Sequence, residues 1–253
     1  MKTTIFYFSA TGNSLYTAKK LAEIMGDSSI DSMTKEPPMN EIGDKNEAVG
    51  FIFPSYYGDL PRLVRKFISE LKINPASWIF CVSTIGAPLG LGQGSVAALE
   101  QLLFEKGLRL CYGRGITMPR NYVMAYNPLP PESGTAANKK ADVKLRRIAD
   151  DIKARKPDIR KSFLTSKKLY ENIESLDESF YAESHCNGCG VCEKICPVKN
   201  IELSDGKPKW KHKCEHCAAC ISWCPQKAIQ YNEKTKMRRR YRNPSVKISD
   251  LTD

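Results

Sequence analysis

The sequence predicts an α/β protein: a doubly wound parallel sheet followed by a second, smaller domain rich in cysteine. Two observations lead to this prediction. Up to about residue 155, short apolar runs rich in β-branched and aromatic residues alternate with longer segments of helical period, as in a sheet covered by helices on both faces. Eight of the ten cysteines then lie between residues 186 and 224. The chain therefore carries two chemistries.

The strands and helices follow from the periodicity. Buried strands are predicted at residues 3–8, 48–53, 78–84 and 108–117, with a weaker strand at 29–33. Apolar residues at helical spacing predict three helices, which carry Leu15 to Met25 before Gly26, Leu63 to Leu71 behind Pro61, and Val96 to Leu103 before Gly107. A polar helix at about 135–155 completes the layer.

The composition is that of a folded globular protein, with 253 residues, 42% of them hydrophobic, and a net charge of +11. It excludes a disordered or collagen-like chain. We expect no membrane span and no signal peptide, and hence a cytoplasmic protein. Because cytosolic thiols stay reduced, the cysteines are expected to be metal ligands or buried apolar residues, and Cys81 and Cys111 are expected to pack in the core.

These features divide the chain into four parts. Residues 1–156 form the sheet domain, and 157–184 form a charged connector with some helix. Residues 185–232 form the cysteine domain, and 233–253 form a basic tail. The run from Lys234 to Arg242 has six basic groups in nine positions and is expected to be a solvated face or a docking patch.

The cysteine motif C-x2-C-x2-C-x3-C-P occurs twice. Three thiolates on one tight loop can bind three irons of a cubane, while the fourth points toward the neighbouring cluster, so the ligands are expected to cross over. One 4Fe-4S cluster would take Cys186, Cys189, Cys192 and Cys224, and the other Cys214, Cys217, Cys220 and Cys196. A zinc module is the alternative, although a third cysteine at this spacing has no role there. His185, His212 and His216 are expected to be exposed or hydrogen-bonding neighbours.

On these motifs, residues 185–231 resemble a two-cluster bacterial-type ferredoxin with an α+β fold. The resemblance implies one-electron transfer.

Three predicted strand-end loops form a second candidate site. Ser9, Thr11, Gly12, Asn13 and Ser14 place small donors at a helix N-terminus, where a monophosphate could bind; an ordinary helix cap is the alternative. Two further loops follow the third and fourth predicted strands, and their aromatic and polar groups could hold a planar ring: Pro54, Ser55, Tyr56, Tyr57 and Gly58, and then Thr84, Ile85 and Gly86. The tyrosine pair could instead be a core corner.

With these loops in place, residues 1 to about 155 resemble flavodoxin, whose FMN phosphate binds where Ser9 to Ser14 lie. The resemblance implies that the Gly58 carbonyl turns toward N5 of the flavin. The whole order resembles the flavodoxin-ferredoxin fusion proteins of anaerobic bacteria, and residues 118–122 fit that family's loop after the fifth strand. Unlike free flavodoxins, this domain is not acidic.

The predicted function is electron transfer between FMN and two 4Fe-4S clusters, and on to or from a redox partner protein with an acidic docking surface. A flavin-dependent reductase of a quinone, nitroaromatic or flavin, fed by its own clusters, is one alternative. A zinc-stabilised interaction module is another. No catalytic acid or base stands out, and no nucleic-acid fold accompanies the basic run. The sequence leaves open the oligomeric state, the partners and the direction of electron flow.

Overall fold

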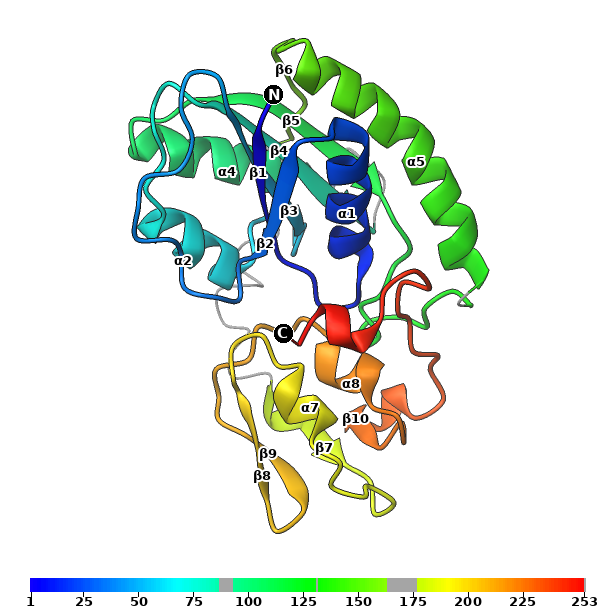
Figure 1. Cartoon of the computed structure of the whole chain (residues 1–253). Helices are drawn as coiled ribbons and strands as arrows, with labels where there is room; N and C mark the ends of the chain where they lie inside the picture. The colour runs from blue at the N-terminus through cyan, green and yellow to red at the C-terminus, as the bar shows by residue number, and fades with distance from the viewer. Residues whose placement is uncertain (87–92, 131, 163–176, 253) are drawn as a thin grey trace. The chain divides into compact units, whose positions relative to one another are not determined.

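The computed structural model describes residues 1–86, 93–130, 132–162 and 177–252 (Figure 1). The chain divides into two compact units, which are treated separately below. The first contains residues 1–9, 13–118 and 136–167, and the second contains residues 10–12, 119–135 and 168–253. The domain boundaries predicted at 156, 184 and 232 stay predictions.

The first unit is built on a six-stranded sheet in the order β2-β1-β3-β4-β5-β6, and every neighbouring pair is parallel. The strands are β1 (Thr3–Tyr7), β2 (Ser28–Ser32), β3 (Ala48–Pro54), β4 (Trp78–Ile85), β5 (Leu110–Thr117) and β6 (Asp158–Ile159). The order of the first five strands is that of a flavodoxin-like doubly wound fold. The predicted fold class is confirmed.

Helices cover both faces of this sheet. They are α1 (Asn13–Met25), α2 (Arg62–Glu70), α4 (Gly94–Glu105) and α5 (Glu132–Lys153). α1 and α5 lie on one face, and α2 and α4 lie on the other (Figure 1). The Tyr16 hydroxyl of α1 donates to Asp142 Oδ1 of α5 at 2.6 Å, and Lys153 Nζ donates to Ile24 O at 2.8 Å. Tyr16 and Lys153 thus join α1 to α5.

The central strands are buried on both sides, as their continuous apolar runs predict. Ile5, Phe51 and Phe80 have no exposed surface. Gly50 of β3 makes room for one of these rings, because a Cβ there would lie 2.2 Å from the Phe80 ring. Cys81 is fully buried in β4, as predicted, whereas Cys111 is only partly covered.

The second unit contains two small antiparallel sheets and two short helices. The elements are β7 (Phe180–Ala182), α7 (Val191–Lys194), β8 (Ile201–Ser204), β9 (Lys207–Trp210), α8 (Ala219–Trp223) and β10 (Ile229–Tyr231), followed by the 3-10 turns η2 (Glu233–Thr235) and η3 (Ile248–Asp250). β7 pairs with β10, and β8 pairs with β9. The predicted connector thus supplies both β6 and β7. Its residues 163–176 lie outside the described part of the chain.

Three arginines of the basic tail donate hydrogen bonds to other residues of the second unit. Arg238 Nη1 donates to the carbonyls of Val123 and Met124, both at 2.8 Å, and Arg239 Nε donates to Pro128 O at 2.9 Å. Arg240 donates to Gln230 Oε1 at 2.8 Å. These guanidinium groups therefore satisfy acceptors within the second unit. Lys234, Lys236, Arg239 and Arg242 are exposed, as expected.

Candidate functional site

The first cysteine loop forms a left-handed turn at two glycines. Gly188 and Gly190 have φ values of 68° and 75°, and α7 begins at the next residue. The turn brings the chain close to the β8–β9 hairpin, because a Cβ on Gly188 would lie 2.8 Å from Gly206 O. Glycine suits both requirements. Cys189 is exposed at the tip of this loop, while Cys192 is buried in α7.

The second cysteine loop repeats this backbone with larger side chains. His216 and Ala218 have φ values of 54° and 64°, and α8 begins directly after Ala218. These residues stand at the positions of Gly188 and Gly190 in the repeat. Left-handed backbone is costly for residues with a Cβ, so their surroundings must hold this turn in place.

Each motif contributes to two separate cavities. Cys186, Cys189, Cys192 and Cys224 line one, and Cys196, Cys214, Cys217 and Cys220 line the other. Their empty volumes are about 300 and 310 Å³, counting space open to solvent. The structure therefore groups the cysteines in the same two crossed sets that the spacing predicts. Among the described residues, no three His, Cys, Asp or Glu side chains are grouped closely enough to hold a single metal ion.

Four of the cysteine thiols lie in a poorly hydrated environment. Burial raises the pKa of Cys192 to about 11 and that of Cys214 to about 12. Burial also raises the pKa of Cys217 and of Cys220 well above the ordinary value, and neighbouring cysteines add to this. Because iron binds thiolate, cluster insertion at these positions must release protons.

Backbone amides point at two of the sulfurs. Asn200 N donates to Cys196 Sγ, and His216 N donates to Cys214 Sγ, both at 3.2 Å. Both sulfurs line the second cavity. Such bonds fix the orientation of a metal ligand and stabilise its charge.

The three histidines are hydrogen-bonding neighbours, as predicted. His185 Nε2 lies 3.2 Å from Gln226 O, and His212 Nδ1 lies 2.7 Å from Asp177 Oδ1. His216 is buried, and its Nδ1 lies 2.7 Å from the Tyr122 hydroxyl.

Other groups beside the cysteines have no motif that could reveal them. Asp177, Asn200, Tyr122 and Arg240 reach the cysteine loops from outside the repeated pattern. Burial lowers the pKa of the Arg240 guanidinium, and the Cys224 and Cys220 sulfurs oppose this shift. Cys224 lines one cavity and Cys220 the other, so a cysteine of each cavity acts on this guanidinium of the tail. Spacing within the motif cannot predict such contacts.

The three predicted strand-end loops follow β1, β3 and β4, and a doubly wound sheet binds ligands at the carboxyl ends of its strands. Ser14 Oγ lies 2.7 Å from Thr84 Oγ1, and both side chains are buried. Ser55 Oγ is also buried and has no hydrogen-bond partner among the described residues. A buried polar atom of this kind suits a ligand that would supply the missing bond.

The loop after β3 closes in a tight turn. Tyr57 and Gly58 have φ values of 53° and 79°, and Tyr56 and Asp59 exchange backbone hydrogen bonds of 3.0 and 2.8 Å. The Tyr56 ring meets the edge of Phe8, with the centroids 6.2 Å apart. Pro54 and Ile85 are the last residues of β3 and β4, and Gly86 follows β4. The residues that follow, 87–92, lie outside the described part of the chain.

Thr11 and Gly12 belong to the second unit, where the C-terminal segment contacts them. Asn121 Nδ2 donates to Thr11 Oγ1, and Asn243 N donates to Thr11 O at 2.8 Å. A Cβ on Gly12 would lie 2.9 Å from Asn243 Cβ and 3.0 Å from Val246 Cβ. The absence of a side chain at Gly12 therefore makes room for residues 243–246.

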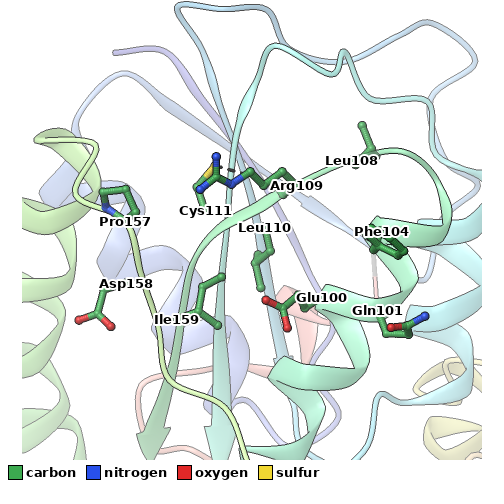
Figure 2. A pocket seen from close by; sticks show the side chains of 10 residues that line it. All are labelled: Glu100, Gln101, Phe104, Leu108, Arg109, Leu110, Cys111, Pro157, Asp158 and Ile159. Carbon is green, nitrogen blue, oxygen red and sulfur yellow. Dashed lines mark hydrogen bonds between the residues drawn. The ribbon is translucent and has the colours of Figure 1, made fainter.

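A larger cavity, with an empty volume of about 1300 Å³ that also counts space open to solvent, lies in the first unit near the start of β5. Figure 2 shows its lining, which comes from α4, from β5 and β6, and from the residues just before these two strands: Glu100, Gln101, Phe104, Leu108, Arg109, Leu110, Cys111, Pro157, Asp158 and Ile159. Its acidic groups are already paired, Glu100 with Lys161 and Asp158 with Arg114. Since Leu110 and Cys111 begin β5, this cavity lies away from the carboxyl ends of the strands.

The cysteine loops match a known family. Residues 185–239 match the model of the 4Fe-4S dicluster domain. The match includes all eight motif cysteines and extends into the tail as far as Arg239. It supports an iron-sulfur redox function for this part of the chain. No curated protein matches the sequence.

Similar solved structures include three flavoproteins. A flavodoxin from Streptococcus pneumonia TIGR4 has a TM-score of 0.41 and 14% identity, covering 61% of this chain and 99% of the other. An FMN-dependent NADH-azoreductase from Bacillus anthracis str. Ames Ancestor gives 0.38, 11%, 59% and 100% for the same quantities. A flavoprotein in complex with FMN from Lactobacillus acidophilus NCFM gives 0.33, 14%, 45% and 92%. These scores are too low to support an argument about this chain.

No described helix is both long enough and apolar enough to cross a bilayer.

Proposed function

We propose that this protein transfers electrons between FMN and two 4Fe-4S clusters, and exchanges them singly with a redox partner protein. The observation that carries the proposal is the pair of cavities lined by crossed sets of four cysteines each. Four thiolates from two loops are the ligand set that a cubane cluster needs. The flavodoxin-like sheet, with polar loops at the carboxyl ends of its strands, supports the proposal that the protein binds a flavin.

The proposed cluster ligands are the cysteines of the two cavities. Each cluster would carry one electron at a time. Ile201, Ile221 and Ile229 pack in the core beside these cysteines and would exclude water from the irons. The short helices α7 and α8 hold Cys192 and Cys220 in place.

The proposed FMN site consists of the three strand-end loops. Residues 9–14 would bind the phosphate, Tyr56 and Tyr57 would lie against the ring, and Thr84 to Gly86 would bind its polar edge. The Ser55 hydroxyl would gain the partner that the described residues do not give it. When bound, FMN supplies a group that accepts two electrons and releases them singly.

The proposed partner is a protein with an acidic surface, and the proposed location is the cytoplasm. Cys189 is exposed in the first loop, and Lys207 Nζ donates to the carbonyl of Cys186, the first cysteine of that loop, at 2.9 Å. Lys227 is exposed in the turn after Cys224, which lines the same cavity as Cys186 and Cys189. Positive groups beside an exposed cluster would attract an acidic partner and speed the encounter.

The test begins with anaerobic purification and analysis of iron, acid-labile sulfide and flavin. We expect about eight irons, eight sulfides and one FMN for each chain. Zinc in place of iron would refute the cluster assignment, and absence of flavin would refute the flavin half. Cys111→Ser is the matched control, because Cys111 lies outside both sets and its loss should leave the metal content unchanged.

A second measurement tests the transfer itself. Limiting dithionite is added to the purified protein, and the flavin and cluster absorbances are followed together. We expect the two signals to relax to one common equilibrium; independent behaviour over minutes would refute internal transfer. Turnover of quinones, nitroaromatics or free flavins with reduced ferredoxin as donor would identify a reductase instead.

A further inference from the structure

The second unit contains an internal repeat, which is seen in its backbone as well as in its cysteines. Each cysteine of the second motif lies 28 positions after its counterpart in the first. The same offset relates Lys199 to Lys227, whose φ values are 50° and 52°. It also relates two backbone hydrogen bonds of 2.9 Å, from Lys211 N to Asn200 O and from Glu183 N to Ala228 O. Asn200 and Ala228 are therefore equivalent positions.

The side chains at these positions break the symmetry. Ala228 has no polar side chain, whereas Asn200 is 1% exposed and makes two side-chain hydrogen bonds. Its Oδ1 accepts from Lys213 N at 2.6 Å, and its Nδ2 donates to Asp177 Oδ2 at 2.9 Å. The backbone N–H of Asn200 also donates to Cys196 Sγ. Asn200 thus links Cys196 to the segment that precedes Cys214.

The acceptor for Asn200 is a buried carboxylate. Asp177 is 1% exposed, and its other oxygen, Oδ1, lies 2.7 Å from His212 Nδ1. The Asp177 charge acts on Cys214. The repeat offset leads from Asp177 to Asp205, which is exposed beside the β8–β9 turn. The aspartate of the first position, Asp177, is therefore buried, whereas its equivalent, Asp205, is exposed to water.

We propose that Asp177 is a positioning residue of the second cavity, acting through Asn200, and that its charge makes the cluster bound there the lower-potential one. A buried negative charge disfavours the addition of an electron nearby, whereas an exposed charge is screened by water. The first cavity has no such carboxylate at the equivalent position, because Asp205 is exposed. Asp177 precedes the matched dicluster domain, so the asymmetry comes from outside it. This inference rests on the proposed cluster binding.

The test is an EPR-monitored redox titration of the full chain and of two matched variants. The unaltered protein should show two reduction steps. Asp177→Asn keeps the shape of the side chain and removes its charge. It should therefore raise the lower reduction potential by about 59 mV, which corresponds to a tenfold change in the one-electron equilibrium constant. Asp205→Asn makes the same chemical change at the equivalent exposed position and should shift neither step by a comparable amount.

Iron analysis separates the charge effect from loss of the site. If Asp177→Asn keeps its irons and both steps stay in place, the inference is wrong. If the variant loses iron, the unaltered protein decides: two resolved steps support the inference, and a single unresolved step overturns it. A chain that binds no cluster in any form would instead refute the proposed function.

Discussion

The two cysteine loops reach the same backbone by different means. In the first, Gly188 and Gly190 adopt positive φ at little cost, and Cys189 is exposed. In the second, His216 and Ala218 take the same conformation, and Cys214 and Cys220 are buried. A repeated ligand spacing therefore fixes the geometry of a loop but not its environment.

The surroundings of His216 show how the second loop is held. Its ring centroid lies 5.1 Å from that of Tyr231 and 5.7 Å from those of Phe180 and Tyr122. These contacts and the Tyr122 hydrogen bond oppose the cost of the left-handed turn. The first loop needs no such support. We therefore expect the two loops to respond differently to equivalent substitutions.

The largest effect is expected from the cysteines themselves. Cys189→Ser and Cys217→Ser should each lose one cluster, about four of eight irons. Cys217→Ser should also cause the greater loss of thermal stability, because its cavity is lined by the buried Cys214 and Cys220. Iron analysis and thermal unfolding measure both quantities. An equal fall in stability for the two variants would contradict this difference in environment.

A smaller effect is expected at the glycines of the first loop. Gly188→Ala combines positive φ with a contact of 2.8 Å to Gly206 O. Gly190→Ala is its matched control, since φ is also positive but the nearest atom, Leu203 Cδ1, is 3.7 Å away. The control should lose about 1 to 2 kcal/mol of unfolding free energy, and Gly188→Ala should lose more. Denaturant unfolding can rank the two, and the reverse order would be inconsistent with the structure.

Removal of the Tyr122 hydroxyl should affect the second loop by about 1 kcal/mol. Tyr122→Phe keeps the ring contact and deletes the hydrogen bond to His216 Nδ1. Tyr181→Phe, which deletes an exposed bond to Glu233, is the control and should cost less. Equal unfolding free energies for the two variants would mean that the buried bond adds nothing.

The smallest effect, and the only stabilising one, is expected for Ala218→Gly. Glycine should relieve the left-handed strain at φ 64° while increasing the freedom of the unfolded chain, for a net gain of up to about 1 kcal/mol. His216→Gly should destabilise instead, because it also removes the ring contacts. A loss of stability in Ala218→Gly would show that the Ala218 methyl group contributes more through packing than its backbone conformation costs.

Much of the fold could be predicted from local patterns. Continuous apolar runs indicated β1, β3, β4 and β5, because buried parallel strands need them. The sequence does not predict β6, since a two-residue strand beside Pro157 has no periodicity. The structure placed the predicted helix at 135–155 three residues earlier, at Glu132.

Within the candidate site, the spacing predicted how the cysteines group but not what surrounds them. The partnership of Asp177 and Asn200 joins positions 23 residues apart. That of Tyr122 and His216 joins positions 94 apart. Contacts of this kind depend on how the chain folds back on itself, and one sequence carries no local sign of them. The hydrogen bonds from Arg238 to the carbonyls of Val123 and Met124 cannot be predicted from the sequence for the same reason.

The discontinuous make-up of the second unit has a practical consequence. Residues 185–239 carry every cysteine ligand that we propose, yet Tyr122, Asp177 and the buried Tyr241 lie outside that stretch. A fragment cut at the borders of the dicluster match would remove the Tyr122 hydroxyl that contacts His216 and the Asp177 carboxylate that accepts from Asn200. The cysteine half of this protein is therefore complete in three dimensions only when distant stretches of the chain are present.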